Sequence, residues 1–244
     1  MTINWIDADR FEIDGCRFTI DITPGPKRRL STANDFTLVK TKRFLQIYDS
    51  IEADLAGKKI LELGIFEGGS LAFFDKRFRP AKLVGLDIRA EPIPALDAYV
   101  AERGGDVKVY YKTSQDDAAR LDRICGEDFG GQVDVIVDDA SHLYELTRKS
   151  FDILFKWLAP GGIYIIEDWA WSYQKPHQES SAAWYKKTGM ATLLFELIGD
   201  VASNTAIENI RIDRTMAIIT KSQAAGSQLT YGRDRLRGRA SPSV

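Results

Sequence analysis

Strand-like and helix-like segments alternate from Lys58 to Asp168, and this alternation constrains the fold more than any other feature. Short apolar runs predict strands at 58–64, 81–88, 107–114, 133–140 and 161–168, and helical spacing of apolar residues predicts helices at 69–79, 94–104, 116–126 and 143–158. Strands separated by helices form right-handed βαβ units in a mainly parallel sheet. The sequence therefore predicts a doubly wound, Rossmann-like α/β fold.

The segments on either side of this region follow other patterns. Residues 11–22 alternate around an Asp-Gly turn and predict a hairpin, and residues 31–55 predict a helix behind an Asn-Asp cap. Residues 169–189 read as an aromatic-rich loop or lid, 190–202 as a helix, and 207–221 as an antiparallel hairpin that turns at Asp213–Arg214 and completes the sheet. We expect an N-terminal hairpin and helix over 1–57 that pack on the core, a core domain over 58–222, and a flexible basic tail over 223–244.

Composition excludes several classes of protein. Lys and Arg number 33 against 35 Asp and Glu, so the net charge of −2 gives no reason to expect a nucleic acid partner. No apolar run is long enough to span a bilayer, and no basic-then-apolar leader opens the chain. Two cysteines, Cys16 and Cys125, form no disulfide framework and favour a cytoplasmic location; with two histidines they also argue against a zinc site. Whether the chain forms a homo-oligomer stays open.

The first strand of the core leads into a glycine-rich turn, ILELGIFEGGS (60–70). Glycines let the backbone approach a ligand closely, and the start of the next helix offers free N–H donors. The spacing G-x-x-x-G-G differs from the dinucleotide fingerprint. An acid that ends the second strand, as Asp87 does, commonly binds ribose hydroxyls. The candidate cofactor-binding residues are Glu62, Gly64, Gly68, Ser70, Asp87, Ser114, Gln115 and Asp138, with Ser114 and Gln115 facing an adenine edge.

Acidic residues end the fourth and fifth strands. The fourth ends at Asp138 and Asp139, with His142 three residues later, and the fifth ends at Glu167 and Asp168. Carboxyl ends of parallel strands are where ligands bind in open α/β sheets. Buried like charges need compensation, so this set of acids suggests a bound cation or a proton-transfer site. Oxygen-rich ligands favour a hard cation such as Mg²⁺.

The motif E-L-G-x-x-x-G-G, with an acid ending the second strand, resembles the class I S-adenosylmethionine-dependent methyltransferases and their seven-stranded fold, over residues 58–222. The DDASH and IIEDW motifs resemble the metal-dependent sugar O-methyltransferases of the macrocin and mycinamicin type, and the related cephalosporin hydroxylase family. The resemblance implies S-adenosylmethionine and Mg²⁺ as cofactors, Asp139, Glu167 and Asp168 as metal ligands, and His142 as the base. Asp138 is assigned to a cap of the strand end or to the cofactor.

These features together predict an O-methyltransferase whose acceptor is a hydroxyl of a sugar or a glycosylated natural product. Alternatives are O-methylation of a catechol-like aromatic diol, and a hydroxylase-associated or non-catalytic cofactor-binding protein. A vicinal diol would bind a metal in either acceptor, so the motifs do not separate them. Aromatic residues of 169–189 form either an acceptor pocket or ordinary lid packing: Trp169, Trp171, Tyr173, Trp184 and Tyr185. His177 is given no role.

Overall fold

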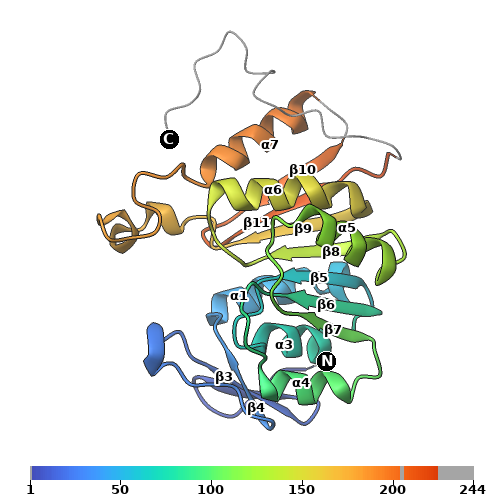
Figure 1. The fold of residues 1–244 in the computed structure, drawn as a ribbon, viewed down its shortest axis with the longest axis vertical. Helices are drawn as coiled ribbons and strands as arrows, with labels where there is room; N and C mark the ends of the chain where they lie inside the picture. The colour runs from blue at the N-terminus through green and yellow to red at the C-terminus, as the bar shows by residue number, and fades with distance from the viewer. Residues whose placement is uncertain (1, 204–205, 225–244) are drawn as a thin grey trace. The chain divides into compact units, whose positions relative to one another are not determined.

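The computed structural model describes residues 2–203 and 206–224 (Figure 1). The chain divides into two compact units, residues 1–114 and 115–244. Most of the predicted tail, residues 225–244, lies outside the described residues. None of the helices in the described ranges has the length and apolar character that crossing a bilayer requires.

The first unit contains the first three strands of the predicted core. β5 (Lys59–Leu63), β6 (Lys82–Leu86) and β7 (Val107–Tyr110) pair in parallel, with α3 (Gly69–Phe78) and α4 (Pro94–Ala101) between them in sequence. Their side chains are largely apolar and buried, which is why each run reads as a strand of a sheet covered on both faces. β7 ends four residues earlier than predicted, because Lys112 adopts a left-handed conformation with φ of 53° that breaks the extended pairing.

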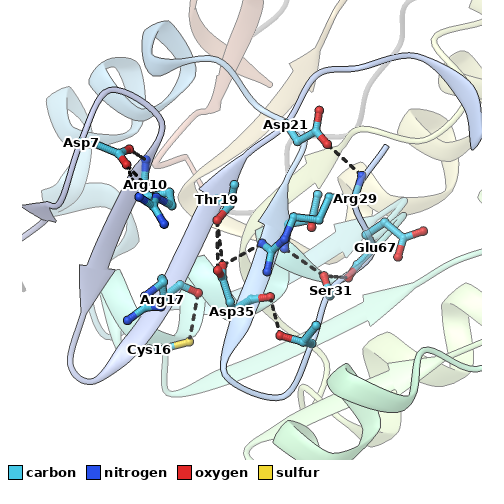
Figure 2. Close-up of polar contacts among 12 residues, drawn as sticks. Asp7, Arg10, Cys16, Arg17, Thr19, Asp21, Arg29, Ser31, Asp35 and Glu67 are labelled. Carbon is cyan, nitrogen blue, oxygen red and sulfur yellow. Dashed lines mark hydrogen bonds and ion pairs between the residues drawn. The ribbon is translucent and has the colours of Figure 1, made fainter. Parts of the chain in front are cut away.

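A second sheet occupies the N-terminal part of this unit. β1 (Asn4–Trp5), β2 (Arg10–Ile13), β3 (Cys16–Ile20) and β4 (Asp35–Leu38) lie in that order. Asp14 and Gly15 between β2 and β3 both have positive φ, 49° and 74°, as a two-residue hairpin turn requires, so the predicted hairpin is confirmed. Polar contacts tie the sheet's exposed edge, including a 2.9 Å bond from Thr19 Oγ1 to Asp35 (Figure 2).

The helix predicted over 31–55 is wrong in its first part. Residues 35–38 form β4, and helices begin only with α1 (Lys42–Ser50) and α2 (Glu52–Leu55). β4 pairs in parallel with β3, opposing Phe36 to Phe18, and this pairing buries both rings. The energy of burying that apolar run in a sheet outweighs the helical spacing, which the sequence sustains only from Phe44 onward. Asn34 precedes β4 and Asp35 is its first residue, so this pair does not cap a helix.

The second unit contains α5 (Ala118–Glu127), β8 (Val133–Asp138), α6 (Tyr144–Leu154), β9 (Leu158–Glu167), α7 (Ala191–Ser203), β10 (Ile207–Ile212) and β11 (Met216–Lys221). β8 and β9 are parallel, and β11 runs antiparallel to both β9 and β10. The predicted helix over 143–158 ends at Leu154, and β9 begins at Leu158, three residues before the predicted strand. A register shift between β8 and β9 accommodates the Pro-Gly-Gly run of 160–162 inside the strand.

The seven strands are ordered β10-β11-β9-β8-β5-β6-β7. This is the predicted mostly parallel sheet with an antiparallel hairpin at one end, so the fold class and the C-terminal hairpin are confirmed. In the second unit α6 and α7 lie side by side (Figure 1). Residues 169–189 contain only short 3₁₀ turns at Trp171–Tyr173 and Lys175–Gln178 among the regular elements, in agreement with the predicted loop.

Candidate functional site

The glycine-rich turn after β5 is held in shape by Asp87. Gly64 and Gly68 have φ of 85° and 78°, conformations that a side chain would strain. One carboxylate oxygen of Asp87, Oδ2, accepts from the backbone N–H of Ile65 at 3.1 Å and of Phe66 at 2.9 Å. Asp87 follows β6, so the acid that ends one strand fixes the turn that follows its neighbour. The structure thus places Asp87 against the turn that contains Gly64 and Gly68.

The N-terminal sheet also shapes this turn. A Cβ on Gly69 would lie 2.0 Å from the carbonyl oxygen of Thr37, so β4 passes against the start of α3. Ser31 Oγ donates to the carbonyl oxygen of Glu67 at 2.8 Å and accepts from the backbone N–H of Thr37 at 3.0 Å (Figure 2). Sequence reasoning missed Ser31 and Thr37. The one sequence feature that pointed to this contact was the pair Gly68-Gly69, which indicates that another backbone segment passes close by but does not say which one.

The remaining residues of the first unit that are predicted to bind the cofactor differ in burial. Glu62, on β5, is fully buried, and Ser70, in the first turn of α3, is 8% exposed. Ser114, which follows β7, is half-buried. Burial of an acid among apolar strand residues is costly unless a charged or polar group meets it. Roles of these residues toward the cofactor stay predictions.

In the second unit, Asp138 and Gln115 belong to a buried hydrogen-bond network. Asp138 accepts from Ser150 Oγ at 2.5 Å, Tyr164 OH at 2.9 Å and Gln115 Nε2 at 3.1 Å. Burial raises the pKa of Asp138 to about 6, and the bonds from Ser150 and Tyr164 oppose that rise. Gln115 Oε1 accepts from the backbone N–H of Ser141 at 3.1 Å. Both side chains are therefore engaged with protein groups, and their predicted contact with the cofactor stays a prediction.

Asp139, His142 and Asp168 converge beyond the ends of β8 and β9. One potential ligand atom from each lies within 4.8 Å of the others, and His142 Nε2 is 3.9 Å from Asp139 Oδ1. The side chains are 11% exposed for His142 and 21% for Asp139, so the cluster is accessible without being open to bulk water. Three of the four residues predicted for metal binding and catalysis on these strands are thus brought together.

Glu167 differs from this set. It is the last residue of β9 and is 1% exposed, whereas Asp168, the next residue, is half-buried. β9 ends at Glu167 and Asp168 leaves the strand with a φ of 53°, so the two acidic side chains lie in different environments. The clustered set therefore contains the predicted base, His142, and two of the three predicted ligands, and it does not include Glu167. Assignment of ligands and base stays a prediction.

Two members of the cluster have unusual backbones. His142 and Asp168 have φ of 54° and 53°, the left-handed region that residues other than glycine seldom adopt. Each such conformation costs on the order of 1–3 kcal/mol and persists only where the surroundings enforce it. The backbone N–H of Asp168 donates to the carbonyl oxygen of Thr215 at 2.8 Å, which ties the end of β9 to the β10–β11 turn.

Aromatic residues of 169–189 lie against His142. The indole N–H of Trp184 donates to the carbonyl oxygen of His142 at 2.9 Å, and the ring of Trp171 is 4.4 Å from the imidazole between centroids. His177, which had no predicted role, stacks on Trp171 at 5.3 Å and meets Trp184 edge-on at 4.6 Å. Trp169 instead donates to the carbonyl oxygen of Asp213 at 2.8 Å. The predicted aromatic pocket residues therefore divide, with Trp171 and Trp184 beside the cluster.

The donor set fits a divalent cation. Two carboxylates within ligand distance of one another repel, and a cation between them would offset that repulsion. Carboxylate oxygens are the ligands that Mg²⁺ prefers, whereas an imidazole serves equally as a ligand for softer divalent metals or as a proton acceptor. The cluster can thus both hold a hard cation and take a proton beside it.

Comparisons with known proteins agree with this geometry. A family model described as a methyltransferase domain matches residues 61–169, which include the glycine-rich turn and both acidic strand ends. Mycinamicin VI 2''-O-methyltransferase of Micromonospora griseorubida is 33% identical over 117 residues, 45% of this chain and 27% of that protein. Demethylmacrocin O-methyltransferase of Streptomyces fradiae is 32% identical over the same shares.

A solved structure of MycE methyltransferase, from the mycinamycin biosynthetic pathway and in complex with Mg, SAH and mycinamycin VI, has a similar fold. It is 25% identical, with a TM-score of 0.58, and the alignment covers 77% of this chain and 51% of that one. The chain spans about a quarter of the length of these curated relatives and about half of the MycE chain. Residues 61–169 thus match a methyltransferase domain, and the chain is similar in sequence and in fold to O-methyltransferases of the macrocin and mycinamicin type.

Proposed function

We propose that this chain transfers a methyl group from S-adenosylmethionine to a hydroxyl oxygen of a sugar or glycosylated natural product, with the assistance of Mg²⁺. The observation that carries the proposal is the convergence of Asp139, His142 and Asp168 at the ends of β8 and β9. Two carboxylates with an imidazole 3.9 Å from one of them supply a cation site and a proton acceptor together. A purely structural role, such as an ion pair or a cap of a strand end, would not require two carboxylates and an imidazole at the same place.

Each group has a stated task in the reaction. Asp139 and Asp168 would hold Mg²⁺, with Glu167 as the further predicted ligand, and the bound cation would lower the pKa of a coordinated hydroxyl. His142 takes the hydroxyl proton, a step worth on the order of a hundredfold or more in rate. The acceptor oxygen then bonds to the methyl carbon while the carbon–sulfur bond of the sulfonium breaks. The products are the methyl ether and S-adenosylhomocysteine, and the proton remains on His142.

The turn of the first unit supplies the donor side of the proposal. Gly64 and Gly68 keep the backbone free of side chains, and Asp87 holds the turn through the N–H groups of Ile65 and Phe66. Oδ2 accepts from both of these N–H groups, and Oδ1, which accepts from the backbone N–H of Arg89 at 2.9 Å, has a further lone pair for a ribose hydroxyl. Fixing the turn before the cofactor binds reduces the entropy lost on binding.

The acceptor class rests on the relatives. The names of the relatives state mycinamicin VI, demethylmacrocin and L-olivosyl-oleandolide as acceptors, the last a compound that carries a sugar, and the DDASH and IIEDW motifs fit that group. A catechol-like diol would bind the same cation through the same two oxygens, so acceptor identity needs a direct assay. Release of S-adenosylhomocysteine is measured with glycosylated macrolides, free sugars and catechol as acceptors. Turnover of catechol alone would contradict a sugar acceptor.

Two variants separate the ligand and base roles. Asp139→Asn should weaken Mn²⁺ binding, measured by calorimetry, and lower turnover with it. His142→Gln should lower turnover far more than it lowers Mn²⁺ affinity, because a base is not needed to hold the cation. If both variants lose Mn²⁺ affinity to the same extent, His142 is a metal ligand and not the base. Full turnover in excess chelator would remove the cation from the mechanism, and S-adenosylmethionine should still bind in chelator.

A further inference from the structure

We propose that Trp184 and Trp171 are positioning residues that hold His142 for proton transfer, an inference that rests on the function proposed above. Both come from the segment 169–189, which follows β9 in the same unit. Trp184 contacts the backbone of His142 through its indole N–H, at 2.9 Å from the carbonyl oxygen. Trp171 contacts the imidazole, at 4.4 Å between ring centroids. One segment therefore restrains both parts of the same residue.

The backbone of His142 needs such a restraint. Its φ of 54° is unfavourable for a residue with a side chain, and the neighbouring bond from the backbone N–H of Leu143 to Ser141 Oγ is long, at 3.3 Å. A carbonyl that accepts a fixed indole N–H cannot rotate freely. Since the same backbone torsions set the direction of the Cα–Cβ bond, the Trp184 bond also sets where the imidazole points.

The imidazole ring is restrained from its other side. Nε2 of His142 lies 3.9 Å from Asp139 Oδ1, and the ring of Trp171 contacts the imidazole at an interplanar angle of 48°. Trp171 is itself supported, because His177 stacks on it at an interplanar angle of 9° and Trp184 meets it edge-on with centroids 5.5 Å apart. Rings that support one another in offset and edge-on contacts form a stiff backing. A side chain held this way loses little entropy when it accepts a proton in the correct geometry.

Positioning of this kind has a kinetic signature. Displacing a catalytic group by about 1 Å can cost on the order of a hundredfold in rate, even when the change is made elsewhere. Trp184→Phe keeps an aromatic ring and deletes only the N–H donor. We expect kcat to fall by about ten- to a hundredfold, with the KM for S-adenosylmethionine unchanged, since Trp184 does not belong to the glycine-rich turn.

Nuclear magnetic resonance tests the inference without turnover, because His142 and His177 are the only histidines in the sequence. Their imidazole Cε1–H resonances are assigned with His177→Gln. In the metal-free protein, Trp184→Phe and Trp171→Phe should each shift the His142 resonance, as the neighbouring ring moves or shrinks. On addition of Mn²⁺, the His142 resonance of the wild type should broaden, and Trp184→Phe should lose most of that broadening.

Trp157→Phe is the matched control. It deletes an indole N–H that donates to Asp122 Oδ1 at 2.7 Å, in the same unit and outside the cluster, so it should leave the His142 resonance and kcat unchanged. An identical His142 resonance and equal kcat in the wild type and Trp184→Phe would overturn the inference. If the His142 resonance of the wild type does not broaden with Mn²⁺, the proposed metal site is wrong. The shifts of that resonance in the metal-free variants still test the positioning role. If Trp184→Phe does not fold, Trp171→Phe, which keeps the indole bond, gives the same readouts.

Discussion

Replacing Gly69 by alanine should destabilise the protein although the backbone at this position suits any residue. Position 69 opens α3, and its φ does not lie in the left-handed region. The added Cβ would meet the Thr37 carbonyl oxygen at 2.0 Å and the Thr37 carbonyl carbon at 2.7 Å. Ordinary carbon–oxygen contacts are about 3.3 Å, so one of the two backbones must move by roughly 1 Å or more.

Neither backbone yields easily. Thr37 is 1% exposed and lies in β4, whose parallel pairing with β3 opposes it to Thr19. A shift of β4 would disturb that ladder, and a shift of α3 would disturb the glycine-rich turn. Overpacking of a dense region costs about 1–3 kcal/mol, and we expect Gly69→Ala at the upper end, about 3 kcal/mol. Its affinity for S-adenosylmethionine should fall as well, because the turn and the helix start move together.

Gly126→Ala is the matched control for this prediction. Gly126 lies in α5, is exposed, and has no atom within 4 Å of an added Cβ, so alanine there should stabilise by about 0.5–1 kcal/mol through helix propensity. The free energy of unfolding is measured in urea from tryptophan fluorescence for both variants. If Gly69→Ala lies within about 0.5 kcal/mol of the wild type by this measure, close approach of β4 is not what requires the glycine.

Three further variants or treatments test other parts of the structure. Tyr164→Phe removes a 2.9 Å donor to buried Asp138 and should lower the free energy of unfolding by about 1.5–3 kcal/mol, measured in urea; no change would mean the bond is absent. Asp87→Asn should weaken S-adenosylmethionine binding in calorimetry, because an amide has one acceptor oxygen where the carboxylate uses Oδ2 for the turn and Oδ1 for ribose; unchanged affinity would refute that role. Burial raises the pKa of Cys16 to about 11 and of Cys125 to about 12, so both thiols should react slowly with a disulfide reagent at pH 8 and rapidly in urea; fast reaction of the folded protein would contradict their burial.

The core of the fold was predictable because its signals are local. Strands such as β5 and β8 are buried on both faces and read as continuous apolar runs, and the glycine-rich turn after β5 marks the first crossover. β4 was not predictable, because its four residues become a strand only through pairing with β3, eighteen residues earlier in the chain. Local spacing cannot reveal a partner of that kind.

In the candidate site, too, the features set by local sequence could be predicted and those set by distant contacts could not. Asp139 and His142 follow one strand at a fixed spacing, so their proximity could be predicted from the sequence. The divergence of Glu167 and Asp168 depends on the left-handed backbone of Asp168, which no residue type signals. The contacts of Trp171 and Trp184 with His142 depend on the path of an irregular segment. Periodicity carries no information about such a path, so the aromatic residues could be singled out but not placed.

Packing of the first forty residues has a practical consequence for anyone trimming or recombining this protein. Phe11 and Phe18 meet Phe73 of α3 edge-on, with ring centroids 6.2 and 6.1 Å apart. A gene shortened to begin at Lys58 would leave Phe73 exposed to water and encourage aggregation. A chimaera that takes α3 and the glycine-rich turn from a relative should therefore take the N-terminal strands of that relative as well.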